Sequence, residues 1–452
     1  MSSRRELLQF VPVNIGADNL FSPDRNGLQQ VVFQIPKLPR IMMGKTLRIN
    51  GTFTVKDVDG NAPDCGDKFF QEAPNATDVF YIDGRIGVSS CIDNLSIQNL
   101  QGATYSNVKN YNRLCSSLVP LNQSFMNYIN GVDDEYAPGK QITQAKRCDK
   151  PFDFSIPLLD GFIQGQPVDM DLVEGLIITL TLAPSNFVVQ GNGWLNPTAS
   201  PPLGAFYELS DIVLSVETEL PDASTQEALQ KNTSGSMTYR TYSSFYSVIV
   251  SNSQNLSYLF NTRDTTALIG NMIPSSWLNN YEYFSSSTPQ LLYPGAGGDL
   301  NNNIRIDDFT YQRSGIRLPY DFEIVSRTSQ DEGTADSVKN MIELNSVRDV
   351  WDLYNFTKSL KTELSNPLSD TKQNKFDRNR YSIVEEDLEN QYNIGVAYDK
   401  FSNGIDFRNE TFALRINSTL PSDVAFPPHS LFLFVEHENT VLFQNGVIQV
   451  LS

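Results

Sequence analysis

The sequence predicts an all-β protein built from two sandwiches, and three observations support this fold class. Apolar and polar residues alternate in many strand-sized segments, which is typical of strands that cover a core with one face only. Segments with helical periodicity are few. A polar stretch at residues 220–237, which contains Pro221 and Gly235, separates two strand-like segments and divides the chain into two mostly β halves.

The bulk composition excludes several classes of function. Of the 452 residues, 40% are hydrophobic and 19% are charged, so the chain can bury large cores and is not a disordered acidic protein. The formal net charge of -18 argues against a protein that grips nucleic acid by its phosphates. The sequence has neither a recognisable secretory signal nor an apolar run of membrane-spanning length, so we expect synthesis in the cytosol.

In the first half, period-two alternation predicts four strands. Phe152, Phe154, Ile156 and Leu158 lie on one face of such a strand, with Pro157 near its end, where a missing N–H matters least. We expect the following Asp-Gly pair, Asp160 and Gly161, to turn the chain into a loop. The four strand segments are 47–56, 152–158, 176–182 and 212–217.

In the second half, strands are expected at 411–417 and 431–435, followed by a hairpin over 441–450. Asn445 and Gly446 tolerate the positive φ angles that a tight two-residue hairpin turn requires.

Two segments have helical periodicity, one in each half. The first covers about 105–129 and is interrupted by Pro120, so we expect one helix before that proline and a shorter turn after it. The second covers about 336–364, where Asp336 can cap the start and Pro367 stops the run.

Two long turn-rich segments, 184–204 and 274–303, interrupt the strand pattern. Loops of this length are usually exposed or functional. The favoured interpretation is a projecting surface crown, and the alternative is a binding site that uses Trp194, Trp277 and Tyr281.

No motif in the sequence predicts a catalytic, metal-binding or cofactor-binding residue, so we expect no enzyme. Asp57, Asp59 and Asn61 match the first ligand positions of an EF-hand loop, but Ala62 and Lys68 occupy the positions that need Gly and a bidentate carboxylate. We interpret this segment as a turn that ends a strand. Acidic clusters at 133–135 and 307–308 are not specific in a chain with 52 acidic residues.

The cysteines and histidines also favour structural roles. Four cysteines without a CxxC pair are expected to be buried free thiols rather than disulfides or metal ligands: Cys65, Cys91, Cys115 and Cys148. His429 and His437 flank one apolar strand and would lie about 27 Å apart, too far to share a metal.

One segment of the first half resembles a known family. SIPLLDGFIQGQPVDMDLVEGLIITLTLA, residues 155–183, is similar to a signature of the double jelly-roll major capsid proteins. These belong to the adenovirus-hexon lineage, which includes polinton-like viruses, virophages and giant DNA viruses. Asp160 departs mildly from the family pattern, which often has Ser there. Segments 91–118, 207–221 and SLFLFVEHENTVLFQNGVIQVLS at the C-terminus resemble further parts of the family pattern, in the same order.

The resemblance implies two side-by-side eight-stranded jelly rolls with few short helices and long loops. The first would cover 41–222 and the second 236–452. It also implies a structural major capsid protein that forms homotrimers, which act as pseudo-hexameric capsomers of an icosahedral virion. The implied partners are neighbouring capsomers, penton and minor capsid proteins and an internal membrane, with no specific nucleic acid and no small-molecule substrate. Synthesis would take place in the host cytosol.

Residues 1–40 are then interpreted as an N-terminal arm. Arg4 and Arg5 stand beside Leu7, Leu8 and Phe10, a combination suited to gripping a neighbouring subunit, a minor capsid protein or an anionic membrane. A frayed terminus is the alternative.

Two rival functions remain open at this point. A β-sandwich that binds or cleaves carbohydrate would use the loop tryptophans and a carboxylate pair. A minor virion protein, such as a penton or spike, would usually have a single jelly roll, so the number of sandwiches distinguishes it from a major capsid protein.

Overall fold

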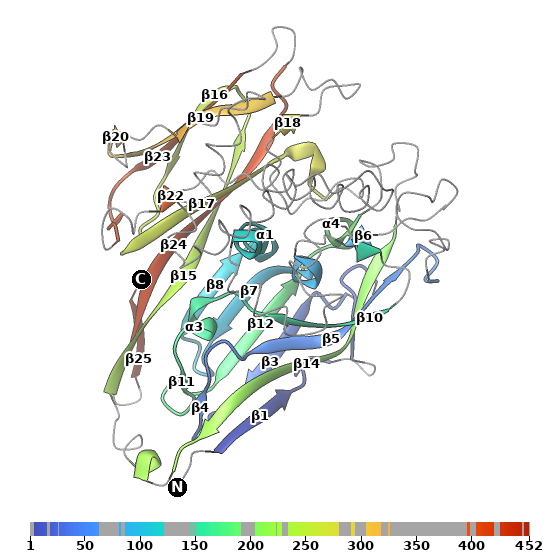
Figure 1. Ribbon diagram of the computed structural model, residues 1–452, viewed down its shortest axis with the longest axis vertical. Coiled ribbons are helices and arrows are strands. Elements are labelled where there is room, and N and C mark those ends of the chain that lie inside the picture. Colours follow the sequence, from blue (N-terminus) through green and yellow to red (C-terminus); the bar gives the residue numbers. More distant parts are fainter. Residues whose placement is uncertain are drawn as a thin grey trace, which may run out of the picture.

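The computed structural model is built mainly of antiparallel strands, which form two sandwiches side by side (Figure 1). It describes residues 4–15, 19–25, 27–62, 81–82, 86–121, 146–147, 151–190, 204–222, 224–227, 234–279, 291–293, 304–317, 324–325, 396–397, 404–419, 425–444 and 447–451.

The first sandwich consists of two main sheets. One has the strand order β10-β5-β14-β4-β11, with β1 and β2 also paired to β14, and the other has the order β3-β12-β7-β8. The strands are β1 (Arg4–Phe10), β2 (Leu20–Phe21), β3 (Gln30–Ile35), β4 (Ile41–Met42), β5 (Arg48–Lys56), β7 (Ile92–Gln98), β8 (Thr104–Lys109), β10 (Phe152–Pro157), β11 (Val168–Asp169), β12 (Leu176–Leu182) and β14 (Phe206–Leu220). A small third sheet joins β6 (Tyr81–Ile82), β9 (Lys146–Arg147) and β13 (Val189–Gln190).

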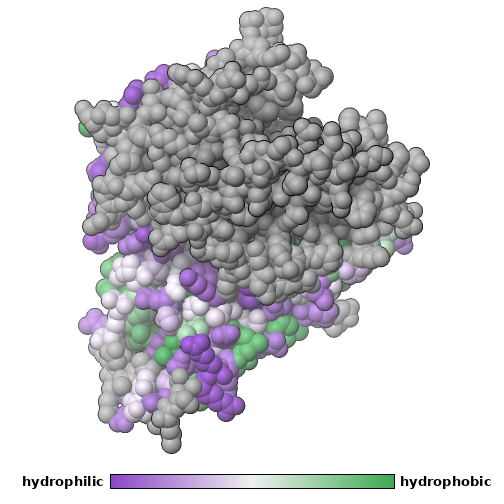
Figure 2. Space-filling view, viewed as in Figure 1, coloured by the Kyte–Doolittle hydropathy of each residue, from purple (hydrophilic) through white to green (hydrophobic). Residues whose placement is uncertain are grey.

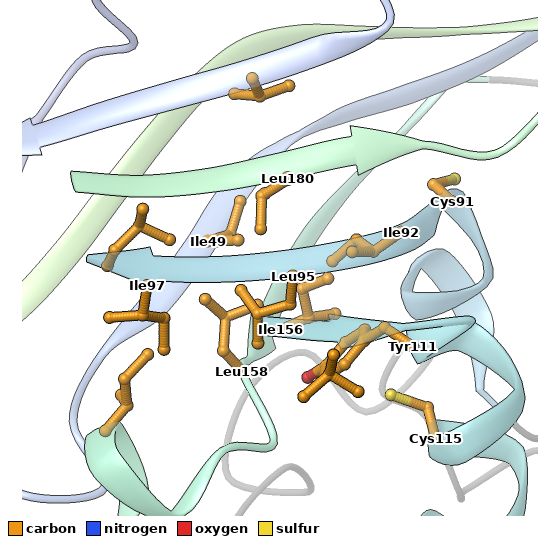
Figure 3. Packing of buried hydrophobic residues seen from close by; sticks show 14 of the residues in the cluster. Ile49, Cys91, Ile92, Leu95, Ile97, Tyr111, Cys115, Ile156, Leu158 and Leu180 are labelled. Carbon is orange, nitrogen blue, oxygen red and sulfur yellow. The ribbon is translucent and has the colours of Figure 1, made fainter. Parts of the chain in front are cut away.

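The core of this sandwich follows from the alternation in its strands. The apolar face of each strand points between the sheets, and the burial of these side chains removes apolar surface from water (Figure 3). Ile49 and Ile156 come from one sheet, and Leu95, Ile97 and Leu180 from the other. All four strands predicted in the first half are confirmed.

The second sandwich has the same plan. One sheet has the order β15-β24-β17-β22, with β25 paired to β24, and the other has the order β16-β23-β19-β18, with β20 and β21 paired to β19. The strands are β15 (Ser234–Ile249), β16 (Ser253–Tyr258), β17 (Thr265–Pro274), β18 (Leu291–Tyr293), β19 (Ile304–Arg313), β20 (Ile316–Arg317), β21 (Ile324–Val325), β22 (Val396–Ala397), β23 (Phe412–Thr419), β24 (His429–Gln444) and β25 (Val447–Leu451). Its core is rich in aromatic rings, with the centroid of Phe260 4.6 Å from that of Phe412.

The predicted strands of the second half are confirmed. Of the predicted segment 411–417, residues 412–417 lie in β23, and segment 431–435 lies in β24. Strands β24 and β25 pair antiparallel with Gln444 opposite Val447, which leaves the two residues Asn445 and Gly446 between the strands, as the predicted hairpin requires.

The described helices are short: η1 (Gly87–Cys91), α1 (Tyr111–Leu121), α3 (Gly161–Gln164), α4 (Ser185–Val188) and η2 (Ser275–Trp277). The helix predicted over 105–129 was wrong for its first residues, and its expected end before Pro120 was also wrong, because helix α1 includes Pro120 and ends at Leu121. Residues 104–109 form β8, because pairing with β7 satisfies their backbone groups, and helix α1 begins only at Tyr111. The second predicted helix, 336–364, lies outside the described residues.

The connection near residue 220 joins two different sheets. Strand β14 ends at Leu220 in the first sandwich, and β15 begins at Ser234 in the second. The proposed boundary at residue 40 needs correction. Strand β1 lies at the edge of one sheet of the first sandwich and β3 pairs with β12 in the other, so residues 4–35 contribute to this sandwich instead of leaving it as a separate arm.

Candidate functional site at the junction of the two sandwiches

The residues with possible metal or catalytic chemistry have structural roles where the structure describes them. The Asp57 carboxylate accepts the backbone N–H groups of Asp59 and Asn61, which confirms the turn after β5. Within the described ranges, no group of His, Cys, Asp and Glu side chains could hold a metal ion. None of the described helices is long and apolar enough to cross a membrane.

The predicted thiols and histidines are buried. Among the described residues, Cys91 and Cys115 are buried thiols outside any disulfide, and they lie on different elements. Burial raises the pKa of Cys115 to about 12. Nδ1 of His429 lies 2.6 Å from the carbonyl of Pro427. Nε2 of His437 lies 2.9 Å from Oγ of Ser243, and burial lowers the pKa of His437 to about 4. Cys65, Cys148, Trp194, Tyr281 and the side chain of Trp277 lie outside the described part.

Several buried polar contacts lie where the two sandwiches meet. Strand β8 is the last strand of its sheet, β15 is the last strand of its own, and these two edge strands pack against each other (Figure 1). Such edges expose backbone groups that must find partners. Side chains supply some of these partners: Oγ of Ser244 donates to the carbonyl of Lys109 at 2.7 Å.

Three residues, Ser106, Asp160 and Thr241, form what we call the junction cluster. Oγ of Ser106 donates to Oδ2 of Asp160 at 2.5 Å and lies 2.8 Å from Oγ1 of Thr241. Ser106 and Asp160 belong to the first sandwich, whereas Thr241 belongs to β15 of the second. The cluster therefore joins the two sandwiches through buried hydrogen bonds.

Asp160 is held in place by the backbone. The expected loop after β10 was wrong: Asp160 is the N-cap of α3, and its Oδ1 accepts the N–H of Phe162 at 2.9 Å. The side chain is only 2% exposed. Burial raises the pKa of its carboxyl to about 6, against the hydrogen bonds from Ser106 and Phe162, which lower it.

The residue after Asp160 has no room for a side chain. A Cβ on Gly161 would lie 2.1 Å from the carbonyl oxygen of Arg240 and 2.9 Å from its backbone nitrogen. Glycine therefore allows the backbone of α3 to touch the backbone of β15.

Aromatic rings pack around this contact. The ring of Phe162 stacks on Tyr105 at a centroid distance of 4.4 Å and meets Tyr239 edge-on at 5.1 Å. The hydroxyl of Tyr239 donates to the carbonyl of Tyr105 at 2.6 Å. The junction thus continues the hydrophobic core of the first sandwich into the second.

A buried cation crosses the junction at the other end of β8. The guanidinium of Arg113, on α1, lies 4.1 Å from the ring centroid of Phe432 on β24 and 5.0 Å from that of Phe187 on α4. Arg113 is 4% exposed, and burial lowers its pKa to about 9 although Asp93 opposes this effect. The sequence pattern did not single out Arg113.

All five residues predicted to contact assembly partners lie on the edge strand β1. Leu8 and Phe10 pack against the core, whereas Leu7 is 61% exposed on the opposite face. Arg4 and Arg5 are exposed and pair with Glu6 and Glu219 of the same chain. Figure 2 shows hydrophobic side chains on the lower part of the surface among hydrophilic ones. The role of these five residues in assembly stays a prediction.

Comparisons with solved structures show the fold of the whole chain. PBCV-1 VP54, fitted into a cryo-EM reconstruction of the virophage Sputnik, is 12% identical with a TM-score of 0.58, and the alignment covers 100% of this chain and 97% of that chain. A chain of the quasi-atomic PBCV-1 capsid has a TM-score of 0.56 at 12% identity and the same coverage of both chains. The Faustovirus major capsid protein has a TM-score of 0.53 at 8% identity, covering 98% of this chain and 91% of that chain. No protein-family model and no curated protein matches the chain.

Proposed function

The chain has the double jelly-roll fold of viral major capsid proteins, and from this premise we propose that it is itself a major capsid protein. The observation that carries the proposal is the extent of the likeness, which spans all of this chain and nearly all of PBCV-1 VP54. The protein would act as a structural component of a virion, with no catalytic role.

The junction supports this function physically. A capsid subunit with two sandwiches must keep them in one fixed orientation, because the lateral contacts of both must form simultaneously in a closed shell. The buried hydrogen bonds of the junction cluster and the aromatic packing around Phe162 resist relative movement of the sandwiches.

Three chains would form a homotrimer with six jelly rolls, which suits a pseudo-hexameric capsomer in an icosahedral shell. Neighbouring capsomers, penton proteins and minor capsid proteins are the proposed partners. The exposed Arg4, Arg5 and Leu7 would contact one of these partners or an anionic membrane beneath the shell. The virion would be the location of the mature protein, after synthesis in the host cytosol.

The test is the mass of the purified chain in solution by light scattering, followed by electron microscopy of concentrated samples. We expect a stable trimer, about three times the chain mass of 50.7 kDa, and hexagonally outlined particles. A monomer at every concentration would contradict the capsomer assignment.

The architecture favours a major capsid protein over a penton or spike, since those proteins usually have one jelly roll and this chain has two sandwiches. The carbohydrate-binding alternative relies on tryptophans whose side chains lie outside the described residues. Specific binding on a glycan array by a monomeric protein would favour that alternative.

A further inference from the structure

We propose that the junction cluster makes the contact between the two sandwiches sensitive to protons: uptake of one proton by Asp160 tightens the contact, and release of that proton loosens it. This inference goes beyond a capsid role, because it concerns how one chain holds its own two halves together. It rests on the geometry of Ser106, Asp160 and Thr241.

The hydrogen bonds of the cluster suit both states of the carboxyl. When Asp160 is ionised, Ser106 donates to Oδ2 and can accept from Thr241. When Asp160 carries a proton, that proton can be donated to Oγ of Ser106, whose own proton then turns to Thr241. The connection between the sandwiches thus survives protonation, and the charge is what changes.

The surroundings make that charge costly. Asp160 is buried, and among the described residues no cation forms an ion pair with its carboxylate. An ionised carboxylate in such a place is disfavoured by desolvation, whereas the neutral acid is not. Removal of the charge therefore favours the closed contact between α3 and β15.

Near pH 6, Asp160 is the residue of the junction cluster that takes up a proton. The other titratable and charged side chains near the cluster lie on β8, α1, β15 and β24. Burial raises the pKa values of Tyr105, Tyr111, Cys115 and Tyr239, so these groups stay neutral. Arg240 approaches Glu436 and Glu438 on β24 at 3.6 Å. These nearby groups are Tyr105 of β8, Tyr111 and Cys115 of α1, Tyr239 and Arg240 of β15, and Glu436, His437 and Glu438 of β24.

His437 is a second titratable group at the junction, and it lies directly opposite Thr241 in the register of β15 and β24. Burial favours the neutral form of its imidazole, so acid lowers the contribution of His437 to folding stability. Acid raises the contribution of Asp160 instead. A test of the proposal must therefore compare variants with each other and not rely on the parent protein alone.

The direction of the effect follows from proton linkage. Because the folded-state pKa of Asp160 is raised from 3.8 to about 6, its contribution to stability is fully present below pH 3.8 and is lost as pH rises through about 6. The contribution of Asp160 to the contact is therefore larger at pH 5 than at pH 7.5.

The experiment is hydrogen exchange of the full chain, followed by mass spectrometry of peptides covering α3 and the facing part of β15. Protection is compared at pH 5 and pH 7.5 after correction for the intrinsic exchange rates. We expect the ratio of acid to neutral protection to be about tenfold or more higher in the parent protein than in Asp160→Asn. Asp153→Asn, which removes an exposed carboxylate from neighbouring β10, should keep the parent ratio. Equal ratios in the parent and Asp160→Asn would overturn the proposal.

A second variant keeps the test decisive if Asp160→Asn does not fold. Ser106→Ala removes a hydrogen bond that favours the ionised carboxylate, so the midpoint of the protection change should move up by about one pH unit. A purely structural role for Ser106 would lower protection at every pH and leave the midpoint in place, which would refute a proton-linked contact. A monomeric but proton-sensitive chain would contradict only the capsid function.

Discussion

At the scale of the residue, Gly161 limits how closely the two sandwiches can approach. Its missing side chain lets the first turn of α3 lie against the backbone of Arg240, and a methyl group there would overlap with main-chain atoms that cannot rotate away. We predict that Gly161→Ala lowers the free energy of unfolding by about 1–3 kcal/mol, as overpacked sites do. Urea denaturation measures this loss.

Gly235, on β15, provides the matched control. A Cβ at that position would lie 3.7 Å from a side-chain carbon of Leu172, an ordinary van der Waals distance. Gly235→Ala should therefore leave the free energy of unfolding within about 0.5 kcal/mol of the parent. Equal losses in both variants would mean that the approach of Gly161 to Arg240 is not as tight as described.

At the scale of the element, the two faces of β1 have different environments: one packs against the core and the other is exposed. Leu8 packs against the core and Leu7 is exposed, although both lie in the same strand paired to β14. We predict that Leu8→Ala lowers the free energy of unfolding by about 1–2 kcal/mol, whereas Leu7→Ala changes it by less than about 0.5 kcal/mol. Chemical denaturation of the two variants tests this difference.

The same pair of variants tests the assembly role of β1. If Leu7 contacts a partner, Leu7→Ala should reduce particle formation while the stability of the isolated chain is unchanged. Normal particle yield in Leu7→Ala would argue that the exposed face of β1 serves no contact, and the segment would then be only an edge strand.

At the scale of the whole molecule, Asp160 and His437 oppose each other as pH changes. Burial raises the pKa of Asp160 to about 6 and lowers that of His437 to about 4. The Asp160 contribution is lost as pH rises from 3.8 through about 6. The His437 contribution is lost as pH falls from 6.5 through about 4. The parent protein should therefore show little net dependence from this pair.

Single substitutions should reveal each contribution. The interval from pH 5 to pH 8 lies above the isoelectric point near 4.6. As pH rises across it, the free energy of unfolding of Asp160→Asn should increase by about 1–2 kcal/mol relative to that of the parent. His437→Gln should lose a similar amount relative to the parent over the same interval. Chemical denaturation at several pH values measures both slopes, and slopes of the same sign would contradict the assigned environments.

Several features of the molecule were determined by the sequence itself. Alternation in segments such as Leu176–Leu182 specifies which face of a strand is buried, because side chains alternate between the two faces along any strand. The Asn-Gly pair predicted a two-residue hairpin connection, and the pairing of Gln444 with Val447 agrees with it. The family resemblance, based on the segment that contains Asp160, predicted the fold of the whole chain.

Only the tertiary structure decided the junction. Residues 105–109 follow a helical pattern, but their backbone groups pair with β7 as part of β8, and this pairing outweighs a weak local preference. The sequence predicted Asp160 as a turn residue. Its burial depends on Ser106, which is 54 positions away along the chain, and on Thr241, which is about 80 positions away. Local sequence patterns carry no information on which side chains from distant strands will share a buried site, because that choice is made when whole sheets pack together.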